Sequence, residues 1–184
     1  MIKPWQELQS AEKGNFRIFS VRSKVCVSPR TGANHEFYVL NSPNWVNVVA
    51  LTDDGRMLFV EQYRQGTNTV ELELPGGIID KEDASPVAAG VRELREETGF
   101  EGQNARIIGE VFANPAFMNN TVYTVMVENC RMTSKTDFDS GEDLSTRLIP
   151  VGDVPSLITG GTIKHSLIVA ALYYYELARR AASR

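Results

Sequence analysis

The sequence has little cysteine and little histidine, two residues of each in 184. Cys26 and Cys130 stand apart, with no CxxC pattern and no histidine nearby, so two buried free thiols are favoured over a disulfide or a metal-binding pair. His35 and His165 have no partner at ligand spacing, and we expect no metal role for either. Because free thiols are typical of a reducing compartment, we expect a cytoplasmic protein.

Long apolar runs and an excess of positive charge are also missing. The longest apolar run, LIVAALYYY, is too short to cross a bilayer, and residues 1–9 lack the apolar segment of a signal peptide. A net charge of −4 provides no basic field for nucleic acid. We therefore expect neither a membrane nor a nucleic acid as a partner.

Alternating apolar and polar residues predict a sheet-rich α/β protein. Residues 15–27, interrupted near residues 22–24, and residues 35–40 predict a hairpin ahead of the main domain. The Asp54-Gly55 turn between two apolar runs predicts a second hairpin. Further strands are expected at residues 70–74, 106–112, 123–128 and 145–151, a helical turn at 153–158 and helices over 86–98 and about 163–181.

The stretch from Leu74 to Phe100 carries the clearest chemical signal. Ser85 followed by Pro86 predicts a helix start, and Gly99 predicts its end. Apolar residues are expected on one face of this helix and three glutamates on another: Val87, Val91, Leu94 and Thr98 against Glu93, Glu96 and Glu97. Such clustering near a helix C-terminus costs stability. Two interpretations follow: a solvated acidic face paired with Arg92 and Arg95, or a site for a hard cation.

This stretch resembles the Nudix box, G-x5-E-x7-R-E-U-x-E-E-x-G-U, where U is aliphatic. The second half is matched by Arg92, Glu93, Leu94, Glu96, Glu97 and Gly99, with Phe100 in place of the last aliphatic residue. The first half departs from the pattern, because Asp83 stands at the acid position counted from Gly77 and eight residues separate it from Arg92. Either Glu82 or Asp83 could therefore hold the box arginine.

Three further features resemble the Nudix subgroup that cleaves ADP-ribose and other nucleoside diphosphate sugars. They are Gln62-Tyr63-Arg64 ahead of the box, Pro115 at 16 residues after Gly99, and the N-terminal hairpin. The resemblance implies an α/β/α sandwich with a mixed curved sheet (residues 45–184) and a β appendage (residues 1–44) that forms a homodimer.

The resemblance also implies roles for individual residues. Glu93, Glu96, Glu97 and the carbonyl of Gly76 would bind Mg²⁺ or Mn²⁺, with Glu96 also counted as catalytic. Glu142, in a polar loop, would be the general base, with Asp143 and Asp139 as substitutes. Substrate would meet Arg64, Trp45, Pro115 and Phe117, whereas Arg92, Asp83 and Gly77 would be structural.

Simpler interpretations stay open for several of these residues. Arg64 would otherwise form a surface salt bridge with Glu61 or Glu71, and Trp45 would otherwise fill the core. The implied reaction is hydrolysis of the diphosphate bond of ADP-ribose or a related nucleotide sugar. The alternatives are another nucleotide substrate (a dinucleoside polyphosphate, coenzyme A or an oxidised nucleoside triphosphate) and a non-catalytic module that binds a nucleotide.

Overall fold

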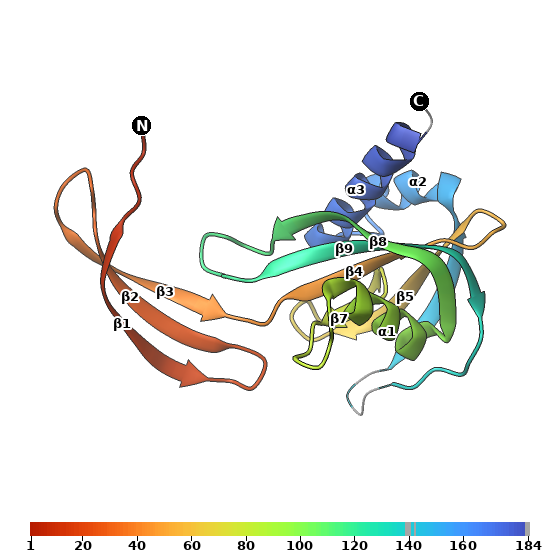
Figure 1. The fold of residues 1–184 in the computed structure, drawn as a ribbon, viewed down its shortest axis with the longest axis horizontal. Coiled ribbons are helices and arrows are strands. Elements are labelled where there is room, and N and C mark those ends of the chain that lie inside the picture. Colours follow the sequence, from red (N-terminus) through yellow and green to blue (C-terminus); the bar gives the residue numbers. More distant parts are fainter. Residues whose placement is uncertain (139–140, 142, 183–184) are drawn as a thin grey trace. The chain divides into compact units, whose positions relative to one another are not determined.

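The computed structural model describes residues 1–138, 141 and 143–182 (Figure 1). The chain divides into two compact units. The N-terminal unit comprises Met1–Pro43 and Phe112–Thr121, and the core unit comprises Asn44–Val111 and Val122–Arg184.

The N-terminal unit is built on a three-stranded antiparallel sheet in the order β1-β2-β3. Its strands are β1 (Gln6–Asn15), β2 (Ser20–Val27) and β3 (Asn34–Asn41). The predicted hairpin is β2 and β3, but the expected interruption at residues 22–24 is wrong and β1 was not predicted. β2 runs through its polar stretch because it pairs with a strand on each side. β1, QELQSAEKGN, has too few apolar residues to show a period of two.

The segment 112–121 belongs to the N-terminal unit although its sequence lies far from the β appendage. The Leu40 N–H donates to the Phe117 carbonyl at 2.7 Å. The Asn119 amide donates to the Asn41 side chain, also at 2.7 Å. The boundary between the two compact units is therefore not a single point at residue 44. Residues 112–121, which the sequence assigns to the main domain, cluster with residues 1–43.

The core unit contains two sheets and three α-helices among the described residues. One sheet has the order β10-β5-β6 and the other β7-β4-β9-β8, in which β4 runs parallel to β9 and antiparallel to β7. The strands are β4 (Trp45–Ala50), β5 (Arg56–Arg64), β6 (Thr69–Glu73), β7 (Gly76–Ile78), β8 (Phe100–Phe112), β9 (Thr121–Met132) and β10 (Leu144–Pro150). The helices are α1 (Pro86–Thr98), η1 (Val151–Asp153), α2 (Val154–Thr159) and α3 (Ser166–Ala182).

Two apolar clusters on opposite faces of the sheets give the core unit its layers. Val48 of β4 packs in the cluster that contains Leu94 of α1, whereas Val49, the next residue, packs in the cluster that contains Ile168 of α3. Successive side chains of a strand point to opposite faces, so α1 covers one face and α2 with α3 cover the other (Figure 1). The expected α/β/α sandwich with a mixed sheet is confirmed.

Helix α1 begins and ends where its sequence predicts. The Ser85 hydroxyl accepts a hydrogen bond from the Ala88 N–H at 3.1 Å, and Pro86 occupies the first turn. At the other end Gly99 has φ 73°, and its N–H donates to the Arg95 carbonyl at 2.8 Å. Both caps are local in sequence, which is why the residues alone predict them.

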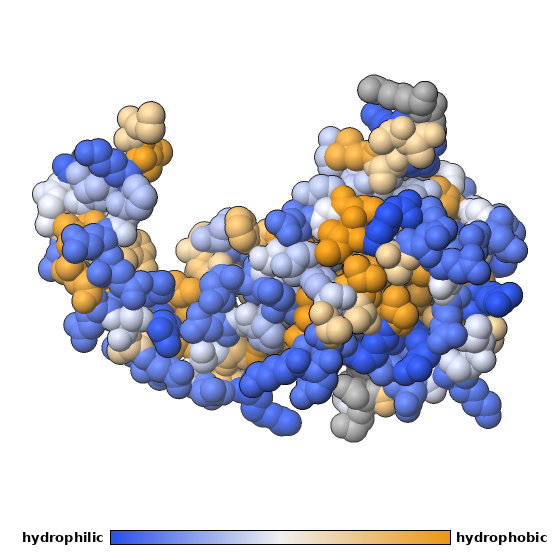
Figure 2. Space-filling model, in the orientation of Figure 1, coloured by the Kyte–Doolittle hydropathy of each residue, from blue (hydrophilic) through white to orange (hydrophobic). Residues whose placement is uncertain are grey.

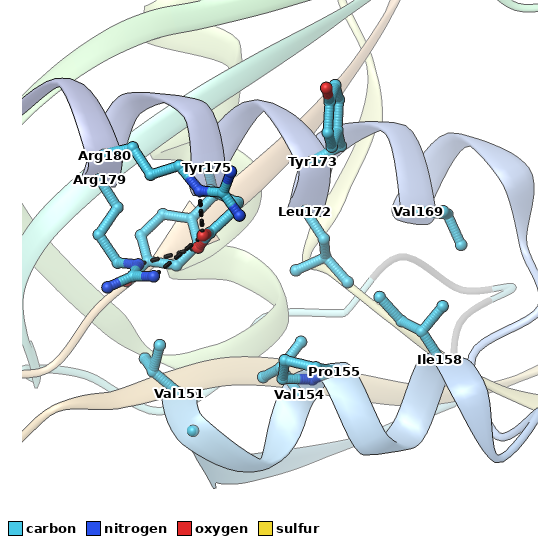
Figure 3. Close-up of a pocket in the computed structure, with 12 residues that line it drawn as sticks. Val151, Val154, Pro155, Ile158, Val169, Leu172, Tyr173, Tyr175, Arg179 and Arg180 are labelled. Atoms are coloured by element: carbon cyan, nitrogen blue, oxygen red, sulfur yellow. Dashed lines mark hydrogen bonds and ion pairs between the residues drawn. The ribbon is translucent and has the colours of Figure 1, made fainter.

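Helices η1, α2 and α3 line an open pocket of about 640 Å³ on the face opposite α1. Figure 3 shows apolar side chains of α2 and α3, among them Ile158 and Leu172, facing each other across it. At one end Glu176 forms ion pairs with Arg179 and Arg180. Within the described chain, every helix is too short or too polar to span a membrane.

Candidate functional site

Helix α1 directs two glutamates at Gly76 and Gly77, which begin β7 just after the bend at Pro75. This bend and the two glycines are called the Gly76–Gly77 turn. Glu97 is 3% exposed, and its Oε2 accepts a hydrogen bond from the Gly76 N–H at 3.0 Å. The Oε1 atom of Glu93 lies 2.6 Å from the position that a Cβ on Gly77 would take. Glycine is therefore required at residue 77 for Glu93 to lie against the backbone. The two carboxylates converge on one turn.

Arg92 joins the acidic loop to this helix. Its Nε and one terminal nitrogen donate to the two oxygens of Asp83, at 3.1 and 2.9 Å, and it also donates to the Ile78 carbonyl at 3.2 Å. Of the two acids that the sequence leaves open, Asp83 rather than Glu82 makes this bidentate contact. The hydrogen bond from Arg92 lowers the pKa of Asp83 and raises that of Arg92 itself.

The same arginine reduces the repulsion among the glutamates. Its other terminal nitrogen lies 3.0 Å from Glu93 Oε1 and 3.0 Å from Glu96 Oε2. Glu96 is more exposed than Glu93 and Glu97 and also approaches Arg95 at 4.0 Å. Glu96 thus fits the interpretation of a solvated acidic residue, whereas Glu93 and Glu97 are buried and do not.

One expectation about this helix is wrong. Val91 was placed on the apolar face but is 37% exposed. The buried face instead includes Ala89, Gly90 and Leu94, together with Glu93 and Glu97. The buried face of α1 therefore differs from the apolar stripe that the sequence predicts, because Glu93 and Glu97 occupy part of that face.

The donor set at the Gly76–Gly77 turn suits a hard divalent cation in its chemistry. Carboxylate oxygens of Glu93 and Glu97 meet there, and oxygen donors are those that Mg²⁺ prefers. In the side-chain arrangement seen, however, no group of three or more His, Cys, Asp or Glu residues among those described is placed to hold an ion. The Arg92 guanidinium lies between Glu93 and Glu96, at 3.0 Å from an oxygen of each.

Arg64 makes a different ion pair from those expected. Its Nε and NH2 donate to the two oxygens of Glu73 at 3.0 and 2.5 Å, so neither Glu61 nor Glu71 is its partner in this pair. The Glu73 side chain is 4% exposed, and His165 Nδ1 approaches its Oε1 at 3.3 Å. Burial alone would raise the pKa of Glu73, but His165 and Arg64 together lower it to about 2. The group is therefore anionic at neutral pH.

The other residues predicted to bind substrate are divided between the core unit and the N-terminal unit. Trp45 begins β4, half-buried, opposite Ile78 of β7 and Val122 of β9. Pro115 and Phe117 lie in the segment 112–121 of the N-terminal unit, where the Phe117 side chain is exposed.

The predicted base, Glu142, lies outside the described residues, as does Asp139. Asp143, the other substitute, is exposed immediately before β10.

Two residues of this region were missed by sequence reasoning. The sequence places Glu73 only within the strand expected at residues 70–74, and it presents His165 only as a histidine without a partner at ligand spacing. Their proximity depends on how α3 packs on the sheet, where it contacts β4, and no local pattern encodes such a contact. The one signal in the sequence is that Glu73 stands between two leucines, Leu72 and Leu74, and the structure buries it with them.

Comparisons with known proteins show the family and the fold of this chain. A family model described as the NUDIX domain matches residues 43–172, which is more than half of the chain. The computed structure superimposes on a crystal structure titled as an ADP compounds hydrolase with a TM-score of 0.88 at 21% identity, covering 100% of this chain and 98% of that one. That likeness shows a common fold.

Proteins of similar sequence are named as pyrophosphatases of ADP-ribose or ADP-sugars. The chain is 25% identical over 140 residues to the ADP-ribose pyrophosphatase of Bacillus subtilis, covering 76% of this chain and 75% of that protein. It is 30% identical over 133 residues to the ADP-sugar pyrophosphatase of Mus musculus, covering 69% of this chain and 61% of that protein. With the family match over residues 43–172, these findings confirm the expected resemblance, and the chain belongs to the Nudix family.

Proposed function

We propose that this protein hydrolyses the diphosphate bond of ADP-ribose or a related nucleoside diphosphate sugar in an Mg²⁺-dependent reaction. The products would be a nucleoside monophosphate and a sugar phosphate. The observation that carries the proposal is the convergence of buried Glu93 and Glu97 on the Gly76–Gly77 turn. The relatives named as pyrophosphatases of ADP-ribose and ADP-sugars support this class of substrate.

In this proposal the glutamates of α1 serve as metal ligands. Glu93 and Glu97 would hold the ion at the turn, with Glu96 and the Gly76 carbonyl completing the set after Arg92 gives up part of its contact with the acids. When bound, a divalent ion neutralises diphosphate charge and makes a bound water more acidic. Nudix hydrolases generally use divalent ions, and Mn²⁺ would serve at the same oxygen donors.

The remaining side chains would bind substrate and move the proton. Arg64 would meet the diphosphate, since its side chain is 44% exposed although Glu73 holds one edge. Glu142 would accept the proton of the attacking water, an assignment that rests on the family resemblance, as do the substrate contacts of Trp45, Pro115 and Phe117. Asp83 and Arg92 would keep the acidic loop against α1.

We also propose that the protein is a homodimer that associates through the N-terminal unit. Its sheet exposes large apolar side chains, and Trp5 packs edge-on against Phe37 at 5.4 Å between ring centroids. The exposed apolar residues of this unit include Leu8, Phe16, Ile18 and Tyr38. Figure 2 shows apolar patches between polar residues on this sheet. Such surface is typical of contacts between chains. Light scattering should give twice the chain mass, and one chain mass would contradict the dimer.

A product-resolved screen tests the reaction. The purified protein is incubated with ADP-ribose, nucleotide sugars, dinucleoside polyphosphates, coenzyme A and an oxidised nucleoside triphosphate, with Mg²⁺ or Mn²⁺. We expect AMP and ribose 5-phosphate from ADP-ribose as the fastest reaction. Faster cleavage of another class would correct the substrate, and binding of ADP-ribose without any cleavage would indicate a non-catalytic module.

A further inference from the structure

Glu73 is shared by two side chains that come from distant parts of the chain. Arg64 of β5 grips both of its oxygens, and His165, immediately before α3, faces the same carboxylate. We propose that His165 is a positioning residue, which acts through its Nδ1 and the Glu73 carboxylate to fix the Arg64 guanidinium for binding the substrate diphosphate. This inference rests on the proposed function and adds a residue to the same site.

Glu73 is suited to be the fixed point of this arrangement. It lies at the end of β6, opposite Val60 of β5, and its side chain is almost completely buried. The group stays charged in spite of its burial because Arg64 and His165 approach it together. A buried carboxylate that is paired on two sides has little freedom to rotate, so it can impose an orientation on its partners.

Of the three side chains, Arg64 is the one whose binding of a ligand would gain most from a fixed orientation. An arginine side chain has many rotamers to lose on binding, and its planar fork binds phosphate well only in a defined orientation. Here the Nε and NH2 edge is bound by Glu73, while 44% of the side chain stays accessible. A ligand therefore meets a guanidinium whose orientation has been set in advance.

The Nδ1 atom of His165 faces Glu73, whereas other parts of the side chain are exposed. The side chain as a whole is 37% exposed, yet its Nδ1 atom is buried. Nδ1 lies 3.3 Å from Glu73 Oε1, which is within donor–acceptor distance although the angles are not those of a hydrogen bond. A small rotation of the ring would let an Nδ1–H donate to that oxygen and limit its movement. The contact joins the start of α3 to β6.

The start of α3 is also attached to the strand beside the turn. Asn47 of β4 donates to the Leu167 carbonyl at 3.4 Å, and Asn47 lies opposite Gly76 in the β4–β7 pairing. Glu73 precedes Gly76 by a single short connection in the sequence. His165 and Glu73 therefore lie in the elements that lead into the proposed metal site.

Two isosteric substitutions separate the two ring nitrogens. His165→Asn keeps a donor at the place of Nδ1, whereas His165→Gln moves the donor to the place of Nε2. For each variant we would measure ADP-ribose hydrolysis with Mg²⁺, and ADP-ribose binding in EDTA by calorimetry. We expect His165→Gln to raise KM and Kd by about three- to tenfold with kcat within about twofold, and His165→Asn to stay within about twofold of wild type.

A double-mutant cycle shows whether the effect passes through Arg64. In an Arg64→Ala background, His165→Gln should have no further effect on KM or Kd. A further loss in that background, equal losses for Asn and Gln at residue 165, or no loss for His165→Gln would each overturn the inference. If His165→Gln fails to fold, Glu73→Gln replaces it, because it keeps the shape of the side chain but removes the charge that holds Arg64.

The same data distinguish this inference from the proposed function. Wild-type protein that neither binds nor cleaves ADP-ribose would contradict the proposed function, and the inference with it. Wild-type protein that binds and cleaves ADP-ribose while every residue-165 variant behaves like it would overturn the inference alone. A purely structural role would lower the melting temperature without raising KM.

Discussion

The Glu97 carboxylate accepts a hydrogen bond of 3.0 Å from the Gly76 N–H, across 21 residues of sequence. This bond joins the last turns of α1 to the glycine turn and fixes where a buried acid meets the backbone. It also explains how a carboxylate is tolerated near a helix C-terminus, where the helix dipole opposes it. The Gly76 N–H stabilises the negative charge on Glu97, which the C-terminal end of the helix dipole would otherwise destabilise.

We predict that Glu97→Gln separates stability from activity. A glutamine can still accept the Gly76 N–H, and it carries no charge to repel Glu93, so the free energy of unfolding should change by less than about 1 kcal/mol. Hydrolysis of ADP-ribose should fall by at least about a hundredfold, because a neutral amide is a poor ligand for Mg²⁺. Denaturant unfolding and initial rates check this. Glu101→Gln, at an exposed acid just after the helix, is the control and should change neither quantity.

Gly77→Ala should damage the site more than the fold. The new Cβ would lie 2.6 Å from Glu93 Oε1, so the carboxylate must move away from the turn. We expect turnover to fall by about tenfold or more, since displacements of about 1 Å in a catalytic arrangement have effects of this order. The matched control is Gly66→Ala, where nothing lies within 4 Å of the added atom. Equal rates for the two alanine variants would show that the Glu93 position does not matter.

Asp83→Asn tests which acid holds Arg92. Asp83 forms two hydrogen bonds with the guanidinium, and its side chain is 8% exposed. Bonds to a charged group contribute about 1.5–3 kcal/mol, so we expect a loss of about 1–3 kcal/mol in unfolding free energy. Glu82→Gln is the neighbouring control, because Glu82 is exposed and should contribute within about 0.5 kcal/mol. A larger loss at Glu82 than at Asp83 would reverse the assignment.

Glu73 should give the protein a pH-dependent stability on the acid side. Its pKa is lowered from 4.5 to about 2, so its contribution is complete above pH 4.5 and is lost as the pH falls through about 2. At ~1.4 kcal/mol per pH unit the shift corresponds to at most about 3 kcal/mol, and partial exposure of Arg64 and His165 reduces this to about 1–2. Unfolding free energies of wild type and Glu73→Gln, compared between pH 4.5 and 2, should converge as the pH falls. Parallel curves would contradict the shift.

Features set by neighbouring residues were predictable from the sequence. The cap at Ser85 and the stop at Gly99 follow from local chemistry, and each is found where expected. The hairpin expected at Asp54-Gly55 is wrong, because β4 and β5 belong to different sheets and share only an isolated bridge at Leu51 and Met57. The mixed sheet followed from resemblance to the family. The strand expected at residues 106–112 is longer, Phe100–Phe112, because backbone pairing with β9 extends through polar residues that show no apolar alternation.

Contacts between distant segments were beyond the sequence. The Glu73–His165 approach depends on the docking of α3, and the choice of Asp83 over Glu82 depends on the path of a loop with one inserted residue. The exposure of Val91 arises because Glu93 and Glu97 take part of the buried face of α1. These three cases share one cause: tertiary packing decides between arrangements that are equally good locally.

The central claim is that Glu93 and Glu97 together bind a divalent ion at the Gly76–Gly77 turn. Titration of Mn²⁺ into metal-free protein, with free Mn²⁺ followed by electron paramagnetic resonance, tests it directly. We predict saturable binding of at least one ion by wild type and none over the same range by the variant carrying both Glu93→Gln and Glu97→Gln, folded as judged by circular dichroism. Equal Mn²⁺ binding by the two proteins would contradict the claim.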